Sequence, residues 1–399
     1  MFAKKSIVTL FFPLAKLHFV IYIICYIKNN HRKEICFMEY NIAEICRGFA
    51  IAGDFVTAER YGTGHINDTF KLSTTAQTYI LQRINTSIFR EPENLMDNFM
   101  RVSAHIASKI EAEKAVNPDC RRRYLQVIMS HKNEPFFIDE NGNFWRCYIF
   151  VDEARTFDIL EKSSQAYAAA KAFGAFQNDL ADMPGRLHET IANFHNTPWR
   201  FGNLKAAVAA DKCGRLKEVT PELDYIMAQE KEYSLLIDEL AAGNIFERTT
   251  HNDTKLNNVL IDDLTGEGIC VIDLDTVMPG LPHYDFGDMV RTGTSPAAED
   301  ETDLSKVGMR FEMFEALLRG YLSTAGNFLN AREKELLPFS GKLITLEIGI
   351  RFLTDYLEGD VYFKIHREKH NLDRCRTQIK LAQSIASQFD AMRKLNDQL

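Results

Sequence analysis

Apolar positions between residues 38 and 151 predict several strands and one long helix. Short apolar runs at 79–81 and 144–151 are typical of buried strands. Between them, apolar residues recur every three or four positions, which predicts one buried face of a helix. These residues are Leu95, Phe99, Val102 and Ile106. We therefore expect this part of the chain to form a small α+β lobe.

After Val151 the apolar positions follow helical spacing, and two stripes stand out. Their members are Ala169, Phe173, Phe176 and Leu180, and, near the end, Ile385, Phe389 and Met392. No repeat or low-complexity linker divides the chain, so a short hinge at 151–153 is the expected boundary. The expected domains are a β-rich lobe at 38–151 and a mainly helical lobe at 152–399.

The first 37 residues differ from the rest of the chain. A mostly apolar stretch at 7–27 is long enough for a membrane anchor, since about 20 apolar residues span a bilayer. Pro13 and Lys16 interrupt it, and no small-residue cleavage site of a secretory signal follows. We expect translation to start at Met38, with the preceding segment outside the fold and no membrane contact unless that segment is a genuine anchor.

Composition excludes some classes of function. The 399 residues are 46% apolar and carry a formal net charge of -8, without a basic stripe that could follow a nucleic-acid backbone. The eight cysteines are scattered and form no Cys-x-x-Cys pair, so neither a zinc site nor a disulfide framework is expected. This use of cysteine is typical of a cytoplasmic protein.

The segment 251–273 carries the candidate chemistry. Two apolar strands flank a turn with Gly266 and Gly268, which predicts an antiparallel hairpin. In such a hairpin the start of the first strand lies beside the end of the second, so Asn258 and Asp273 should meet. An amide and a carboxylate oxygen suit a nucleotide-bound Mg²⁺, which completes its coordination with water and phosphate oxygens.

Asp253 lies five residues before Asn258, the offset of the catalytic loop of kinases. There the Asp accepts or orients the attacking hydroxyl and the Asn binds metal, while Lys255 could neutralise charge on the transferred group. An Asp before a strand is more often a cap or turn residue. The hairpin and the terminal Asp273 together favour the catalytic interpretation.

The triplet Asp285-Phe286-Gly287 matches the metal-binding motif of protein kinases. Asp273 already ends the hairpin strand, whereas Asp285 precedes a probable helix. We therefore expect Asp285 to cap that helix or to brace the catalytic loop.

In the first lobe, Gly62, Thr63 and Gly64 predict a strand-turn-strand whose backbone N–H groups could approach phosphates. A hairpin turn needs glycine whatever it binds, so this signal is ambiguous. His65 is either a substrate donor or a polar side chain satisfied within the fold.

Several long segments together resemble the aminoglycoside phosphotransferase and choline kinase superfamily and, within it, kinases of N-acetylhexosamines. They are the segments at 62–69, 251–260, 271–280 and 284–291, with supporting matches at 144–150, 173–178, 337–341 and 351–363. The resemblance runs from about Ile42 to Ile385. It implies a bilobal, protein-kinase-like α+β fold with a nucleotide-binding first lobe and a catalytic, sugar-binding second lobe. The implied reaction is ATP-dependent phosphorylation of the anomeric hydroxyl of N-acetylglucosamine or N-acetylgalactosamine, as in amino-sugar salvage.

The resemblance also implies residue roles. Asp253 would be the base, and Asn258 and Asp273 would hold Mg²⁺ with ATP as co-substrate. Sugar recognition is implied for His65, Arg351 and Tyr362. Lys255 and Thr254 would lie beside them.

One residue departs from the superfamily pattern. Gln82 stands where many relatives carry a Lys or Arg that pairs with the nucleotide phosphates. Arg83 is the next cation along the strand, and it should face the opposite side of the sheet because strand side chains alternate. How these two nucleotide-binding candidates would hold the α- and β-phosphates is left open.

Two other functions fit the sequence. The acceptor could be another small alcohol, such as choline, an aminoglycoside or a thioribose, because the acidic residues at 355–360 could favour a cationic substrate. The protein could also be a nucleotide-binding regulator without catalysis. Arg351 has its own alternative, an ion pair with Asp355 one helical turn away, with Tyr362 packed in the core.

Overall fold

The computed structural model describes residues 40–62, 66–110 and 118–399, and Ile42–Leu399 forms one compact unit. The segment at 1–37 and the three residues Thr63, Gly64 and His65 lie outside the described residues. Within the described part of the chain, no helix has the length and apolar character needed to cross a bilayer.

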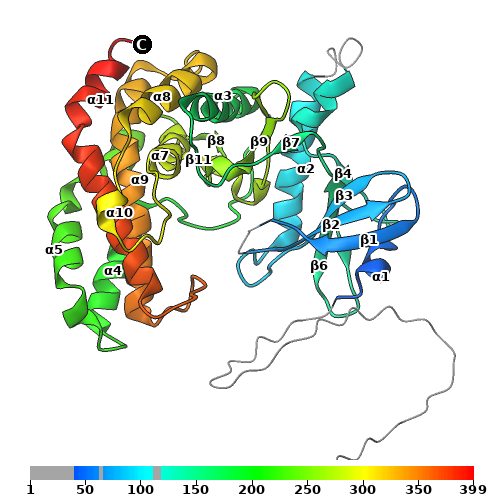
Figure 1. The fold of residues 1–399 in the computed structure, drawn as a ribbon, viewed down its shortest axis with the longest axis horizontal. Coiled ribbons are helices and arrows are strands. Elements are labelled where there is room, and N and C mark those ends of the chain that lie inside the picture. Colours follow the sequence, from blue (N-terminus) through cyan, green and yellow to red (C-terminus); the bar gives the residue numbers. More distant parts are fainter. Residues whose placement is uncertain (1–39, 63–65, 111–117) are drawn as a thin grey trace, which may run out of the picture. The chain divides into compact units, whose positions relative to one another are not determined.

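The first part of this unit is an antiparallel sheet with a long helix against it (Figure 1). Its elements are α1 (Ile42–Cys46), β1 (Phe55–Arg60), β2 (Asp68–Thr74), β3 (Thr78–Arg83), α2 (Pro92–Lys109), η1 (Pro118–Arg123), β4 (Val127–Ile128), β5 (Phe137–Ile138) and β6 (Phe144–Ile149). The strand order is β1-β2-β3-β6-β4, and β5 also pairs with β6. The four apolar residues predicted for one face of the helix are all buried on α2, which confirms that prediction.

The second part is mainly helical, with two small sheets. Its elements are β7 (Ala154–Arg155), α3 (Ser163–Leu180), α4 (Thr197–Ala210), η2 (Leu216–Glu218), α5 (Thr220–Ala228), η3 (Glu230–Glu232), α6 (Leu235–Ala241), β8 (Arg248–Thr250), η4 (Leu256–Asn258), β9 (Val259–Asp262), β10 (Gly268–Val271), η5 (Leu274–Thr276), β11 (Met278–Gly280), α7 (Pro282–Gly293), η6 (Leu304–Lys306), α8 (Phe311–Ala325), α9 (Ala331–Glu358), α10 (His370–Ser387) and α11 (Phe389–Asn396). The 28-residue α9 packs against α4, α7, α10 and α11, and α3 packs against α8. The expected α+β bilobal class is confirmed.

The apolar stripe on α3 is buried as predicted, but the stripe near the end of the chain is divided between two helices. Helix α10 ends at Ser387 and α11 begins at Phe389. Gln388 interrupts the helical backbone with φ -110° and ψ 5°, and its side-chain amide donates to the Met309 carbonyl at 2.9 Å. Helical spacing alone does not reveal a break of this kind, because Ile385 and Met392 are buried on both sides of it.

Strands β9 and β10 form the predicted hairpin, with Val271 opposite Val259. Gly266 adopts a positive φ of 71° in the turn. Gly268 serves a different purpose, since a Cβ there would lie 2.7 Å from the Ala168 carbonyl oxygen of α3. The glycine therefore lets the hairpin pack closely against α3.

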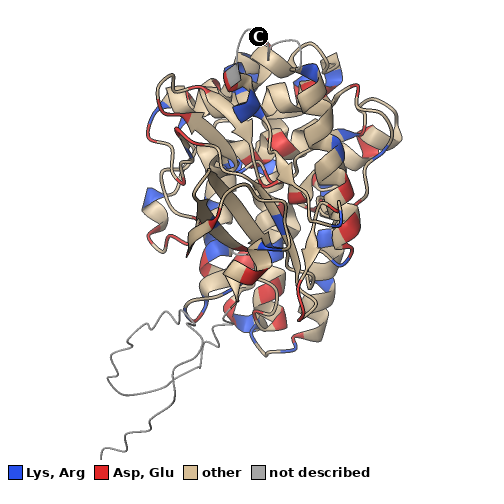
Figure 2. Ribbon diagram, turned by 90° about the vertical axis from the view of Figure 1, so that its right-hand side faces the viewer, with Lys and Arg blue, Asp and Glu red and all other residues tan. Residues whose placement is uncertain are grey.

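Acidic and basic residues are interspersed over the helices rather than separated into fields of one sign (Figure 2). Many of them pair locally, as Arg319 does with Glu315 one turn earlier on α8. Such exposed pairs contribute little to stability, at about 0.3–0.5 kcal/mol each.

Candidate active site

The hairpin places Asn258 and Asp273 at the same end of its ladder. Asn258 immediately precedes β9, and its carbonyl accepts a hydrogen bond from the Ile272 N–H at 2.9 Å. Asp273 follows Ile272 in the left-handed conformation, with φ 58° and ψ 57°. This backbone conformation is uncommon for a residue other than glycine and often occurs at functional sites. The predicted meeting of these two positions is observed.

The loop between β8 and η4 carries Asp253 and is held by Asp285. One carboxylate oxygen of Asp285 accepts from the His251 N–H at 2.9 Å and the other from the Asn252 N–H at 2.6 Å. Its backbone carbonyl accepts from the Thr254 hydroxyl at 2.6 Å. Asp285 is fully buried in the first turn of α7 and braces the loop that carries Asp253, one of the two roles expected from the sequence.

His251 connects the same loop to the hairpin. Its Nε2 donates to the Ile272 carbonyl at 2.9 Å, so Nδ1 is the unprotonated nitrogen and accepts from the Asp253 N–H at 3.3 Å. The rings of Phe173 and Phe176 on α3 pack against this imidazole. The position of Asp253 is therefore fixed from the backbone rather than by its own side chain.

The Asp253 carboxylate lies 3.0 Å from the Lys255 ammonium. The Asn258 side-chain amide donates to the Asp253 backbone carbonyl at 2.8 Å, so the two residues lie close together although five positions separate them. Burial alone would raise the pKa of Asp253, but the Lys255 charge holds it below the usual value. An ionised carboxylate with a low pKa is a weak base that orients a hydroxyl well and takes its proton late.

Asp273 has the opposite electrostatic environment. Burial and the nearby carboxylates of Asp275 and Asp253 raise the pKa of Asp273 to about 6. Three acidic groups so close together would be stabilised by a cation. The described residues contain no group of three His, Cys, Asp or Glu side chains suited to a metal, but a nucleotide-bound Mg²⁺ needs only one or two protein ligands. The Asn258 and Asp273 oxygens therefore fit Mg²⁺.

A buried ion pair joins β6 to the end of the hairpin. The Arg146 guanidinium binds the Asp275 carboxylate, and its Nε donates to the Gln82 side-chain oxygen at 2.9 Å. Burial opposes a charged guanidinium, but the Asp275 carboxylate raises the pKa of Arg146. Arg83 faces the other side of the sheet, as expected, and binds Asp68 with an N–O distance of 2.6 Å.

Arg351 and Tyr362 lie together at the end of α9. The Arg351 guanidinium is 5.1 Å from the Phe194 ring, 5.7 Å from Phe363 and 6.0 Å from Tyr362. Within the described part of the chain it forms no hydrogen bond or ion pair. Asp355 is not its partner, because that buried carboxylate accepts from the backbone N–H groups of residues 361–363 and from Asn371.

Arg200 adds a second positive charge beside Arg351. Its guanidinium donates to the Phe194 carbonyl at 3.0 and 3.1 Å. Burial and the Arg351 charge lower the pKa of Arg200 to about 10. A group defined by Phe194, Arg200, Arg351, Tyr362 and Phe363, which we call the arginine–aromatic cluster, therefore combines guanidinium donors with aromatic faces.

The arginine–aromatic cluster is connected to the catalytic loop through His195. The His195 Nδ1 lies 2.7 Å from the Glu347 carboxylate, one turn before Arg351 on α9, and its Nε2 lies 2.8 Å from the Asn252 carbonyl. Burial disfavours the imidazolium, but Glu347 raises the pKa of His195. A protonated His195 donates to both partners and so joins α9 to the residue before Asp253.

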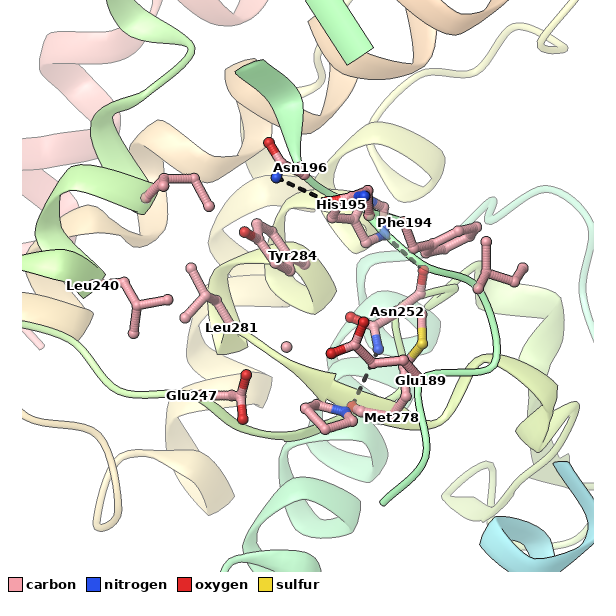
Figure 3. A pocket seen from close by; sticks show the side chains of 15 residues that line it. Glu189, Phe194, His195, Asn196, Leu240, Glu247, Asn252, Met278, Leu281 and Tyr284 are labelled. Carbon is pink, nitrogen blue, oxygen red and sulfur yellow. Dashed lines mark hydrogen bonds between the residues drawn. The ribbon is translucent and has the colours of Figure 1, made fainter. Parts of the chain in front are cut away.

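A small pocket of about 170 Å³ is lined in part by Asn252, the residue before Asp253 (Figure 3). Glu189, His195 and Tyr284 surround it, and the Asn252 amide points toward β11. Phe194 belongs both to this pocket and to the arginine–aromatic cluster. The pocket therefore adjoins the groups that surround Arg351.

The remaining predicted site residues fall into two groups. Gly62 lies in the loop after β1 with φ 78°, and a Cβ there would meet no atom of the described residues within 4 Å, whereas Thr63, Gly64 and His65 are outside the described residues. Thr254 is fully buried, and its hydroxyl is occupied by the Asp285 carbonyl, so it supports the loop.

Sequence reasoning missed Arg146, Asp275, His195 and Glu347. For Arg146 there was a signal, namely a charged residue inside an otherwise apolar strand. Asp275 lies two residues after the predicted ligand Asp273. His195 and Glu347 are 152 residues apart and carry no local motif that links them.

The fold is similar to those of several solved kinases. One is a microcompartment-associated aminopropanol kinase, with 14% identity, 88% of this chain and 98% of that chain covered, and a TM-score of 0.55. Another is an aminoglycoside phosphotransferase from Alicyclobacillus acidocaldarius, with 11% identity, coverages of 89% and 96%, and a TM-score of 0.57. A third is a spectinomycin phosphotransferase in complex with ADP and spectinomycin, with 13% identity, coverages of 88% and 97%, and a TM-score of 0.51.

At such identities these similarities establish the fold alone. A family model described as the phosphotransferase enzyme family matches residues 57–305, which is more than half of the chain. The matched range contains the first sheet except the start of β1, the loop that carries Asp253, the hairpin and α7. The chain therefore belongs to the phosphotransferase enzyme family.

Proposed function

We propose that this phosphotransferase is an N-acetylhexosamine 1-kinase, which transfers the γ-phosphoryl group of ATP to the anomeric hydroxyl of N-acetylglucosamine or N-acetylgalactosamine. Family membership supports phosphoryl transfer, and kinases of this superfamily use ATP with Mg²⁺. The sugar is supported by the motif resemblance and by one observation, the arginine–aromatic cluster.

This cluster offers the two kinds of contact that a sugar needs. The Arg351 guanidinium presents fixed N–H donors to hydroxyl or acetyl oxygens, because within the described part of the chain it contacts aromatic rings but forms no hydrogen bond or ion pair. Tyr362 is half exposed and contributes a hydroxyl and an aromatic face, on which the apolar face of a sugar ring can pack.

The charge of the cluster argues against a cationic acceptor such as choline or an aminoglycoside. Arg200 and Arg351 would repel an ammonium group. Two of the three acidic residues at 355–360 do not compensate, because Asp355 is buried and Asp360 binds Arg215 with an N–O distance of 2.6 Å. A neutral N-acetylated sugar suits this site better than a cation.

The proposed reaction assigns each group a step. The acceptor hydroxyl oxygen attacks the γ-phosphorus, its proton passes to Asp253, and the bond to the ADP oxygen breaks. Lys255 stabilises charge on the transferred group and keeps Asp253 ionised. Asn258 and Asp273 would hold Mg²⁺, which neutralises charge on the β- and γ-phosphates when bound. The Asp285 and His251 contacts hold the loop so that the Asp253 carboxylate can reach the acceptor hydroxyl.

A panel of acceptors tests this proposal. Purified protein with Mg-ATP is offered hexoses, N-acetylhexosamines, choline and aminoglycosides, ATP consumption is measured, and the phosphorylated position is determined by NMR. We expect turnover with N-acetylglucosamine or N-acetylgalactosamine and phosphate on the anomeric oxygen. Turnover with choline or aminoglycosides alone would identify another small-alcohol kinase. A protein that consumes no ATP with any acceptor of the panel would be a regulator without catalysis.

A further inference from the structure

The pair formed by Arg146 and Asp275 is not explained by the steps assigned so far. Arg146 lies on β6 with 1% of its surface exposed, and Asp275 lies two residues after the proposed metal ligand Asp273. A buried ion pair is weak evidence for stability, because the desolvation of both charges offsets their attraction. The position of this pair therefore calls for another reason.

The sheet register places Arg146 beside the residue that departs from the superfamily pattern. Gln82 on β3 is directly opposite Arg146 on β6, and directly paired residues project from the same face of a sheet. The Arg146 Nε donates to the Gln82 amide oxygen, and the Gln82 amide nitrogen donates to the Thr69 hydroxyl at 2.9 Å. The neutral Gln82 thus holds a cation supplied by the neighbouring strand.

The guanidinium keeps donors for a ligand. It has five N–H groups, of which Nε serves Gln82 and Nη1 serves Asp275. Its Nη2 forms no hydrogen bond with any residue that the structure describes. Its partner Asp275 lies in η5, and the residue directly before η5 is Asp273, the carboxylate proposed to bind Mg²⁺.

The other cations of the sheet are engaged elsewhere. Arg83 is on the opposite face and binds Asp68. Lys71 is on the same face but two residues further along the strands, where its ammonium lies 4.2 Å from the centre of the Phe150 ring. Arg146 is therefore the cation placed where a strand Lys would meet the phosphates.

The carboxylate that holds this cation also comes from a different element than in protein kinases. In protein kinases a helix Glu holds the strand Lys that contacts the phosphates. Here α2 presents the Phe99 ring 5.1 Å from the Arg146 guanidinium, and the carboxylate comes instead from Asp275. We propose that Arg146 binds the α- and β-phosphates of the nucleotide in place of a cation at Gln82, and that Asp275 positions it. This proposal rests on the proposed use of ATP, but not on the identity of the acceptor.

Calorimetry of the full chain with ADP and with adenosine, both in the presence of Mg²⁺, tests the proposal. Arg146→Gln should weaken ADP binding about tenfold or more, because a charge-assisted contact to phosphate is lost, with adenosine affinity within about twofold of wild type. The control Arg60→Gln, at an exposed position on the opposite face of the sheet, should leave both affinities unchanged. Equal losses for ADP and adenosine, or no loss for ADP, would overturn the assignment.

Arg146→Gln removes the ion-pair partner of the buried Asp275 and leaves the Asn67 amide, at 2.7 Å, as a donor to its carboxylate, so a second variant separates binding from folding. In Gln82→Lys/Arg146→Gln the cation returns on the neighbouring strand, and ADP affinity should recover to within a few-fold of wild type. A folded double variant that binds adenosine normally and ADP weakly would contradict the proposal. Normal ADP binding by a wild-type protein that phosphorylates no N-acetylhexosamine would remove the proposed acceptor and leave this inference standing.

Discussion

At the residue scale, the proposed role of Asp253 depends on an ionised carboxylate beside Lys255. Asp253→Asn keeps the size and the backbone contacts of the side chain but removes proton acceptance. We expect kcat to fall by about 10² to 10⁴, with ATP affinity nearly unchanged. Steady-state kinetics and calorimetry measure the two quantities separately.

A matched control for this change lies in the turn of the β9–β10 hairpin. Asp263 is exposed in the turn and pairs only with Arg155 among the described residues. Asp263→Asn should leave kcat unaltered. Turnover of the Asp253 variant within a few-fold of wild type would remove Asp253 from the reaction.

Arg351 offers a second prediction at this scale. Because it has no hydrogen-bond partner in the described part of the chain, Arg351→Ala removes donors that the proposed sugar would use. We expect the sugar KM to rise tenfold or more, which corresponds to at least about 1.4 kcal/mol. The ATP KM should stay nearly constant. The loss of packing against the aromatic rings should cost at most about 1 kcal/mol of stability.

The exposed Arg319 of α8 is a suitable control, since Arg319→Ala removes the same charge far along the chain from the cluster. An Arg351 variant with a lower melting temperature and an unchanged sugar KM would mean that Arg351 only packs the end of α9.

At the scale of elements, the end of the hairpin carries Asp273, the proposed metal ligand, and α7 carries Asp285, which supports the loop before η4. Asp273→Ala should abolish Mg²⁺-dependent ATP binding in calorimetry, because it removes one of two proposed ligands. Asp285→Ala should mainly destabilise the fold, by about 2–4 kcal/mol, since two buried N–H groups lose their acceptor. Normal Mg-ATP binding by the Asp273 variant would return the metal role to Asp285.

Helix α7 also contains a buried histidine, His283, whose protonation lowers the stability of the fold. His283 is fully buried, and its Nε2 donates to the Glu333 carbonyl at 2.9 Å, while Nδ1 has no partner among the described residues. Burial lowers the pKa of His283 to about 4, from an ordinary value of 6.5. The unfolded chain therefore binds the proton more readily, and stability is lost as pH falls from about 6.5 toward 4.

His283→Gln keeps a donor for the Glu333 carbonyl and cannot be protonated. Between pH 7 and 4 the wild type should lose on the order of 3 kcal/mol more unfolding free energy than this variant. Denaturant titrations at several pH values measure the difference, and His131→Gln, at an exposed position, is the control. Parallel pH profiles for wild type and the His283 variant would contradict the argument.

At the scale of the whole molecule, the compact unit begins at Ile42, after the segment expected to lie outside the fold. We predict that a chain starting at Met38 is folded and retains full kinase activity. Circular dichroism and the acceptor assay measure this. Loss of folding on truncation, or membrane association of the full chain in cell fractionation, would contradict it.

The sequence by itself determined the class of fold and brought together the residues proposed for the site. Helical periodicity placed the buried face of α2, and two apolar strands around a glycine turn predicted the β9–β10 hairpin with Asn258 and Asp273 at one end. These features are local, so a few neighbouring residues are enough to specify them. The motif resemblance pointed to the family that matches residues 57–305.

Only the tertiary structure decided how distant groups combine. The pairing of Arg146 with Asp275 joins residues 129 positions apart, and His195 meets Glu347 across 152 positions. The partners of Asp355 likewise decided that this carboxylate does not pair with Arg351. Such contacts depend on how whole elements pack, and neither spacing nor periodicity along the chain records that packing.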